Sequence, residues 1–277
     1  MGEIANSVAQ ASRASKNWIV RLAQWGFAAK GVVYVLIGAL AVMAALGRDR
    51  QGADRNGAAQ LIFEQPFGKI LAILLVIGLA GYVIWRLIEG IKDPHHRGSN
   101  AKGILKRVGY IFSGLTYAAF AFSLVRLITG SGQSSSGGNS QKSLAAKMLA
   151  TDWGPYAVSA IGLVVMGIGL RYLYKAYQNN FIQKLNVQGL QTQVKKWISR
   201  IGQIGYAARG VVWLVIGYFA LRAGLNSNAN EVKSSSGAFN FIEQSTGSIV
   251  LLIIAIGVVA YGIYMFVKAK YYQIRLD

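Results

Sequence analysis

The amino-acid sequence predicts an all-α polytopic membrane protein, in which six transmembrane helices form three parallel two-helix repeats in a pseudo-threefold bundle. Three observations predict this fold. The 277 residues are 53% hydrophobic and 14% charged, with a mean hydropathy of +0.38, whereas a soluble domain carries about 25% charged residues. Six apolar stretches are long enough to cross a bilayer, which takes about 20 residues per helix. The sequence also matches itself at a constant offset, which indicates tandem repeats.

The apolar stretches locate the six helices along the chain. The three prolines lie at their ends or between them, so straight helices are expected. Polar segments at 48–65, 131–151 and 226–246 join the two helices of each pair. The second segment contains the Gly/Ser-rich run SGQSSSGGNSQKS, which we expect to be flexible with nothing to pack. The predicted helices are Trp25–Leu46, Phe67–Ile88, Val108–Ile128, Trp153–Tyr174, Ile204–Leu225 and Gly247–Phe266.

The distribution of lysine and arginine predicts the orientation in the membrane. Twenty of these residues lie on the side of the two termini and nine on the other side, so the positive-inside rule predicts that both termini are cytoplasmic. The same bias accounts for the net charge of +19 and the pI near 10.2. The basic residues lie between hydrophobic stretches rather than on a nucleic-acid-binding surface, so no nucleic-acid partner is expected. No cleavable signal precedes helix one, which we expect to act as a signal anchor.

Recurring motifs define the repeats. Helix one reads WGFAAKGVVYVLIG from Trp25 and helix five reads IGYAARGVVWLVIG from Ile204, an offset of 179 residues. A weaker middle copy begins with VGYIFSGLTY at Val108. The predicted organisation is a cytoplasmic N-terminal segment with an interfacial helix (1–24), repeat 1 (25–95), repeat 2 (96–178), an interfacial amphipathic linker (179–203), and repeat 3 with a cytoplasmic tail (204–277).

The motif G-[FY]-A-A-[KR]-G-V-V-[YW], followed by IG, resembles that of a bacterial family known as the domain of unknown function 1206. The resemblance covers roughly Arg21 to Lys270. It implies that each unit is a helix pair and that the protein lies in the bacterial plasma membrane. The middle copy departs from the pattern, since Ile111-Phe112-Ser113 replaces the Ala-Ala-Lys/Arg core. The family implies no activity, substrate or catalytic residue.

Repeat symmetry brings cations and aromatic residues into equivalent positions near the cytoplasmic face. In two of the three units a cation precedes an aromatic residue by one helical turn, within reach of a cation–π contact. Two interpretations stay open. The cations extend to lipid phosphates beside an interfacial aromatic belt, or they form a ring that faces an axial cavity. The equivalent residues are Lys30, Ser113 and Arg209, followed by Tyr34, Tyr117 and Trp213.

A second equivalent set, Met43, Arg126 and Arg222, lies nearer the opposite face. An arginine at a helix centre costs about 2.5–3.5 kcal/mol, and less near the interface, so these side chains are expected to extend outward. The alternatives are that they attract anions into a vestibule, or that they pair with Glu64 and Glu243. Those glutamates otherwise cap the returning helices through the helix dipole.

Glycines recur at positions where small residues let helices approach closely in lipid. Their spacing is not a strict GxxxG, so homodimerisation is not implied. We interpret the following as helix-packing positions: Gly26, Gly31, Gly78, Gly109, Gly114, Gly162, Gly205, Gly210 and Gly257.

The sequence contains no cysteine and none of the common motifs of metal, nucleotide or hydrolase sites. His95 and His96 are adjacent in a charged loop without further metal-ligating partners, so no metal and no cofactor are expected. No acidic residue falls deep in a predicted helix, which argues against a proton relay. We therefore expect no enzyme activity and no catalytic residue.

Two functions fit these observations. The favoured one is a non-enzymatic structural or protein-interaction bundle that also holds anionic lipid headgroups, since each basic residue gains about 1 kcal/mol at an anionic leaflet. The alternative is a channel or passive transporter for a small anion along the pseudo-threefold axis, with Lys30, Arg209, Arg126 and Arg222 as candidate cations. A membrane enzyme is the third hypothesis.

Overall fold

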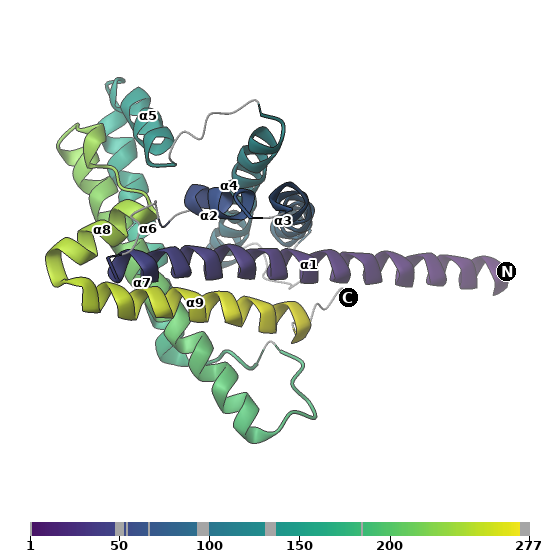
Figure 1. Ribbon diagram of the computed structural model, residues 1–277. Coiled ribbons are helices and arrows are strands. Elements are labelled where there is room, and N and C mark those ends of the chain that lie inside the picture. The colour runs from purple at the N-terminus through teal and green to yellow at the C-terminus, as the bar shows by residue number, and fades with distance from the viewer. Residues whose placement is uncertain are drawn as a thin grey trace.

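The computed structural model describes residues 2–47, 53, 55–65, 67–92, 100–130, 137–183 and 185–271. The elements formed by these residues are helices (Figure 1). In chain order they are α1 (Gly2–Ala45), α2 (Arg55–Phe63), α3 (Gly68–Ile91), α4 (Ala101–Ile128), α5 (Gly137–Leu149), α6 (Gly154–Gln178), α7 (Thr192–Leu225), the short 3-10 helix η1 (Ala229–Glu231), α8 (Ser235–Thr246) and α9 (Ser248–Tyr271).

Six of these helices confirm the predicted membrane spans. α1, α3, α4, α6, α7 and α9 each contain a stretch long and apolar enough to cross a bilayer. The N-terminal ends of two spans differ from the prediction, because α1 is continuous from Gly2 and α7 already begins at Thr192. The segments before the spans contain no proline, so the helices continue through them without a break. Residues 2–24 and 192–203 of the predicted interfacial segments are therefore not separate helices, since each stretch runs into the span that follows.

Short helices also form in the three polar segments, where only irregular connections were expected. α2, α5 and α8 each bury apolar residues, among them Ile62, Ala145 and Phe239. An amphipathic stretch that can bury one face has a reason to fold as a helix. The prediction of a flexible run is wrong for the part from Gly137 onward, which begins α5. Residues 131–136 of that run lie outside the described residues.

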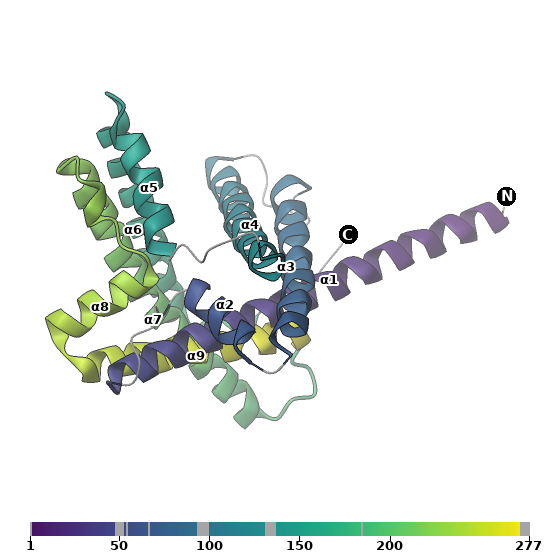
Figure 2. The same ribbon diagram turned by 45° about the horizontal axis from the view of Figure 1, so that its top comes forward.

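Contacts between helices follow the pseudo-threefold prediction, with one difference. The most extensive interfaces, α9–α1, α3–α4 and α6–α7, each join the returning helix of one repeat to the outgoing helix of another. Within repeats 1 and 3 the two helices also touch, but α4 and α6 of the middle repeat hardly do. Figures 1 and 2 accordingly show α1 and α9 side by side, with the α3–α4 pair and the α6–α7 pair apart from each other. The bundle is an open arc that ends at α4 and α6.

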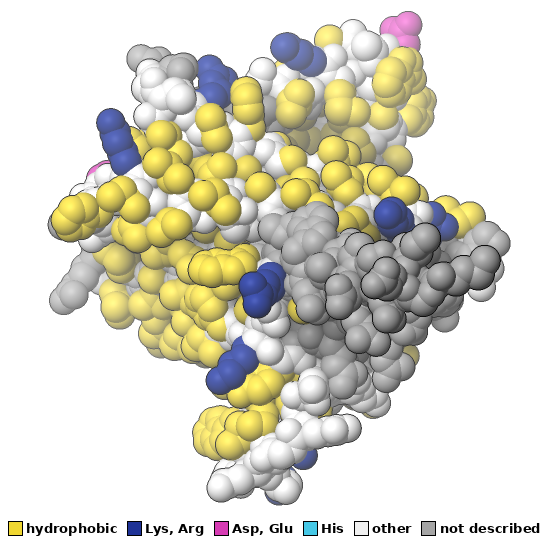
Figure 3. Space-filling view, turned by 90° about the vertical axis from the view of Figure 1, so that its right-hand side faces the viewer, with side chains coloured by type: hydrophobic (Ala, Val, Ile, Leu, Met, Phe, Trp, Pro, Cys, Tyr) yellow, Lys and Arg dark blue, Asp and Glu magenta, His cyan; other side chains and the backbone are white. Residues whose placement is uncertain are grey.

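The outer surface of the bundle is strongly apolar. Figure 3 shows hydrophobic side chains over most of the described part of one face, with lysines and arginines scattered among them. Large side chains such as Ile77, Leu163 and Ile253 expose about 60% of their surface. An apolar patch of this extent is rare on a soluble monomer and marks a surface that meets another apolar phase. Together with the six spans, it fits a multi-pass membrane protein.

Candidate functional site

Lys30, on α1, points into the bundle rather than toward lipid phosphates. Only 4% of its surface is exposed. Its ammonium nitrogen lies 4.9 Å from the centroid of the Tyr82 ring, 5.1 Å from Tyr117, 5.8 Å from Tyr261 and 5.9 Å from Tyr34. Ring faces within about 6 Å attract a cation through their quadrupole, most strongly where water is excluded. Tyrosines of all three repeats thus surround one ammonium group.

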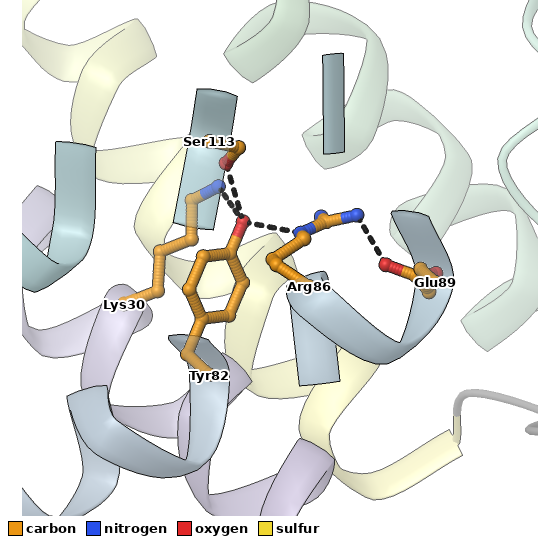
Figure 4. A network of polar contacts seen from close by, with 5 residues as sticks. All are labelled: Lys30, Tyr82, Arg86, Glu89 and Ser113. Atoms are coloured by element: carbon orange, nitrogen blue, oxygen red, sulfur yellow. Dashed lines mark hydrogen bonds and ion pairs between the residues drawn. The ribbon is translucent and has the colours of Figure 1, made fainter. Parts of the chain in front are cut away.

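A single tyrosine hydroxyl organises the polar contacts of Lys30 (Figure 4). Lys30 Nζ donates to Tyr82 Oη at 2.9 Å, and Arg86 Nε donates to the same oxygen at 2.8 Å. The third contact of that oxygen is Ser113 Oγ at 3.2 Å. Because Tyr82 accepts two hydrogen bonds, its own proton is available to Ser113. Arg86 then pairs with the buried carboxylate of Glu89 at 2.6 Å, which closes the network.

Arg209, on α7, occupies the position equivalent to Lys30 and is also buried, with 6% exposed. Its guanidinium carbon lies 4.3 Å from the centroid of the Tyr34 ring, 4.5 Å from Tyr261, 4.9 Å from Tyr172 and 5.8 Å from Trp213. Among the described residues no carboxylate pairs with it. Its Nη1 atom is buried and has no hydrogen-bond partner there. Arg209 therefore keeps donor capacity that the described residues do not use.

A cavity of about 90 Å³ lies beside Arg209. Each of the three polar-segment helices contributes a polar side chain to it, namely Arg55 from α2, Gln141 from α5 and Ser235 from α8. Burial alone lowers the pKa of Arg55, but the phenol groups of Tyr34 and Tyr117 raise it more, so the net direction is upward and Arg55 carries its charge. The remaining lining residues are Tyr34, Ile37, Arg209, Val212, Trp213, Ile216, Phe239 and Val258.

Helix-packing glycines set the positions of the two central tyrosines. A Cβ on Gly26 would lie 2.5 Å from the Tyr82 Cα, and a Cβ on Gly205 would lie 2.5 Å from the Tyr261 Cα. These two pairs are related by the same offset of 179 residues that relates the repeats. Only a residue without a side chain allows the backbones to approach so closely. The close approach brings each tyrosine ring beneath a buried cation.

The other predicted glycines are tightly packed, with one exception. A Cβ would come within 3.3 Å of a neighbouring helix at Gly31, Gly78, Gly114, Gly162, Gly210 and Gly257. Gly109 of the middle repeat has no described atom within 4 Å of that position, so the packing role predicted for it is not present. The physical reason is the separation of α4 from α6, which removes the partner that Gly26 and Gly205 have.

Further cations lie toward the C-terminal ends of the returning helices. α3 contributes Arg86, α6 contributes Lys175 and α9 contributes Lys268. Lys175 Nζ donates to Tyr206 Oη at 3.0 Å and lies 4.1 Å from the ring centroid. Lys268 Nζ lies 4.1 Å from the centroid of the Phe27 ring. Each cation again rests on an aromatic ring inside the bundle.

The predicted vestibule arginines do not line the cavity. Arg126 and Arg222 are both exposed, as expected for side chains that extend outward. Arg222 Nε pairs with Glu231 Oε2 at 3.0 Å, a partner on η1 that replaces the proposed Glu243. The cations that line this cavity are Arg209 and Arg55, so the anion-attracting role considered for Arg126 and Arg222 finds no support at this cavity. Met43 is exposed as well.

Sequence reasoning missed several residues of the site. Tyr82 and Tyr261 carry a usable signal, since both end the repeated IG-x-x-x-Y motif of the returning helices. Glu89 follows the predicted end of its helix at Ile88, whereas α3 continues to Ile91 and buries it. Among the described residues no group of three or more His, Asp or Glu could hold a metal ion. His95 and His96 lie outside them.

Comparisons with known proteins agree with the repeat pattern. The family model described as "Domain of Unknown Function (DUF1206)" matches three times, at residues 25–93, 108–179 and 204–272. The chain is also similar to the uncharacterized protein YxxB of Bacillus subtilis (strain 168), with 30% identity over 258 residues, which cover 93% of this chain and 92% of that protein. No solved structure matches the chain.

Proposed function

The chain belongs to the family of the domain of unknown function 1206, and from this premise we propose that it is a non-enzymatic protein of the bacterial plasma membrane that moves a small anion passively across the bilayer. The observation that carries the proposal is the Arg209 guanidinium at the cavity. Its Nη1 atom is buried without a hydrogen-bond partner among the described residues. A buried ionised group without a partner is unfavourable. A bound anion supplies both the missing charge and the missing acceptor.

A series of neighbouring cations supports passage through the bundle rather than binding alone. Arg55 and Lys30 lie over the same Tyr117 ring, at 5.0 and 5.1 Å. Lys30 and Arg86 donate to the same Tyr82 oxygen. Each cation is therefore one side chain away from the next, from the cavity toward the cytoplasmic end. An anion that leaves the cavity meets further positive charge along this line.

The inward placement of Lys30 and Arg209 also supports the second of the two functions expected from the sequence. A bundle that acts only by packing and lipid contact has no use for cations at its centre, where their desolvation is costly. Cations that serve lipid contact would extend to the headgroups. Both side chains are instead more than nine-tenths buried, which favours transport of an anion.

Anion flux tests the proposal. Purified protein in liposomes loaded with potassium chloride or potassium nitrate is treated with valinomycin, so that potassium efflux requires a parallel anion leak. We expect salt efflux with the wild-type protein and at least tenfold slower efflux with Arg209→Gln, because that change removes the charge at the cavity. Empty liposomes give the background rate.

The matched control is Arg222→Gln, which removes an equal charge from an exposed arginine paired with Glu231. We expect its efflux rate to equal that of the wild type. Vesicles that stay tight with folded wild-type protein overturn the proposal. Equal loss of flux in both variants would place the pathway elsewhere and overturn the role of Arg209.

A separate observation, at the first turns of α7, supports a second role, which is contact with lipid headgroups. The first turns of α7 present exposed Lys196 and Arg200 beside Trp197, which is 56% exposed. Tryptophan and basic residues together suit the headgroup region of an anionic leaflet. We propose that anionic lipid headgroups contact this segment on the cytoplasmic side. The Lys196→Gln/Arg200→Gln double variant is expected to retain less phosphatidylglycerol after purification, and unchanged retention contradicts this contact.

The orientation is part of the proposal. The excess of lysine and arginine on the side of the termini supports cytoplasmic termini, and the cavity then opens toward the opposite face. Because the chain contains no cysteine, single cysteines introduced at Ser236 and at Gln193 report the two sides without background. A membrane-impermeant thiol reagent is expected to label Ser236→Cys in intact cells and Gln193→Cys only after lysis. The reverse result overturns the orientation.

A further inference from the structure

The cavity beside Arg209 has one cationic region and a long apolar wall. Arg209, Val212 and Ile216 lie at positions i, i+3 and i+7 of α7, so they follow one face of that helix over about 10 Å. Tyr34 and Ile37 repeat the same step on α1. Arg209 and Arg55 supply the positive charge of the cavity, and aliphatic side chains continue from Arg209 along α7 and from Tyr34 along α1.

The cationic region combines donors suited to a planar oxyanion. Arg209 offers the unpartnered Nη1 atom, and Arg55 brings a second guanidinium to the same cavity. Two guanidinium groups match the geometry of a carboxylate, whose two oxygens accept several hydrogen bonds at once. The ligand does not need a second negative charge to balance the two guanidinium groups, since aromatic faces already stabilise Arg209.

The apolar wall argues against a small inorganic ion as the best ligand. Ile37, Ile216, Phe239 and Val258 offer no hydrogen bond to a hydrated anion. They offer favourable burial to methylene groups, about 0.8 kcal/mol each in transfer experiments, or roughly fourfold in affinity. The cavity holds about 90 Å³. At about 15 Å³ for each water-sized group, this volume corresponds to about six non-hydrogen atoms.

We propose that this cavity binds a short-chain monocarboxylate of about four carbons. The carboxylate lies against Arg209 and Arg55, and the alkyl chain lies along Val212 and Ile216. This inference rests on the proposed function, since it names the class of anion that the same site selects. The affinity of the site then increases with the length of the alkyl chain until the chain fills the cavity.

Isothermal titration calorimetry of the full-length protein in detergent tests the proposal with the sodium salts of acetate, propionate, butyrate and octanoate. We expect one site, with affinity rising about fourfold for each methylene from acetate to butyrate and falling at octanoate. Butan-1-ol and butylammonium are not expected to bind, since they lack the negative charge. This series needs no variant, so it is independent of any effect of mutation on folding.

Two variants test the location of the site. Arg209→Gln is expected to weaken butyrate binding at least tenfold, whereas Arg222→Gln is expected to leave it unchanged. Val212→Thr keeps the shape but places a hydroxyl on the apolar wall, so it is expected to reduce the preference for butyrate over acetate. Butyrate binding that is equal in Arg209→Gln and wild type overturns the assignment to this cavity.

The outcomes separate this inference from the proposed function. Chloride efflux without chain-length-dependent binding overturns the monocarboxylate site and leaves anion transport standing. Chain-length-dependent binding, with vesicles that stay tight to chloride, nitrate and butyrate alike, supports the site and overturns transport. Affinity that continues to rise to octanoate identifies a membrane-derived fatty acid as the source and overturns the short-chain limit. Absence of both binding and flux overturns both proposals.

Discussion

Lys30 and Arg209 occupy equivalent positions in the first and third repeats, but their surroundings differ. Lys30 donates to Tyr82 within a network that ends at the Arg86–Glu89 ion pair. Arg209 has aromatic faces around it, no carboxylate partner among the described residues, and a buried Nη1 atom left without an acceptor. The same repeat position thus holds one cation that the protein itself satisfies and one that it leaves available.

The difference shows how a duplicated helix pair acquires separate roles. In both repeats a glycine of the outgoing helix packs on a tyrosine of the returning helix, which keeps the backbone geometry the same. Side chains outside this shared framework then decide the role of each cation. Ser113 of the middle repeat reaches the Lys30 network, whereas Arg55 of α2 reaches the cavity of Arg209.

The largest expected effect concerns the acid that closes the Lys30 network. Glu89→Ala leaves the Arg86 guanidinium, 13% exposed, without its carboxylate. Removing one partner of a buried ion pair costs about 3–5 kcal/mol. We expect a loss of this size in the free energy of unfolding, measured by titration with sodium dodecyl sulfate in mixed micelles.

The exposed pair between Arg222 and Glu231 provides the control for this change. Arg222 is 47% exposed, and such pairs contribute about 0–1 kcal/mol. Glu231→Ala is therefore expected to be nearly neutral. Equal losses of unfolding free energy in Glu89→Ala and Glu231→Ala would mean that the buried ion pair of the Lys30 network contributes no more than an exposed pair. That result would contradict the comparison between Lys30 and Arg209.

A direct test of the comparison replaces the two equivalent tyrosines. Tyr82→Phe removes the oxygen that accepts from Lys30 and Arg86, and a hydrogen bond to a charged group contributes about 1.5–3 kcal/mol. Tyr261→Phe keeps the ring face that lies 4.5 Å from Arg209. We expect the first variant to lose about 1.5–3 kcal/mol of unfolding free energy and the second to lose much less. The same detergent titration measures both, and the reverse order contradicts the separation of roles.

The shared framework is tested by adding a methyl group to the packing glycines. Gly26→Ala and Gly205→Ala place a Cβ against Tyr82 and Tyr261, and overpacking of this kind costs about 1–3 kcal/mol. The two losses are expected to be similar, because the contacts are equivalent. Gly109→Ala meets no described atom within 4 Å and is expected to gain up to about 1 kcal/mol from helix propensity. A cost at Gly109 would mean that α4 and α6 do pack together.

Much of the fold could be predicted from the sequence, because its signals are strong. Hydropathy located six spans, and the offset of 179 residues identified equivalent positions such as Lys30 and Arg209. The offset does not give the rotation of a helix about its own axis, since apolar residues cover both the lipid-facing and the inner faces of these spans. The sequence therefore left open whether the two cations point inward.

The cavity could be predicted less well, because three of its polar residues, Arg55, Gln141 and Ser235, come from outside the repeats' strongest motifs. Arg55 lies in a polar segment, and the residue 179 positions later is Ser234, so symmetry gives no hint of its role. Gln141 lies in the run expected to be flexible. Arg126 and Arg222 were candidate cations because they occupy equivalent positions in two repeats. Both lie near a helix end, however, which lets their side chains extend outward.

The smallest expected effect concerns the middle repeat, where a serine replaces the cation. Ser113 Oγ lies 3.2 Å from Tyr82 Oη, and one neutral hydrogen bond contributes about 0.5–1.5 kcal/mol. Ser113→Ala is expected to lower the unfolding free energy by that amount, while Ser123→Ala, at an exposed serine bonded to its own helix, stays near zero. Anion efflux is expected to be unchanged in both, because neither serine lines the cavity. If Ser113→Ala slowed efflux as Arg209→Gln is expected to, the polar network around Lys30, and not only its positive charges, would determine the rate of anion transport.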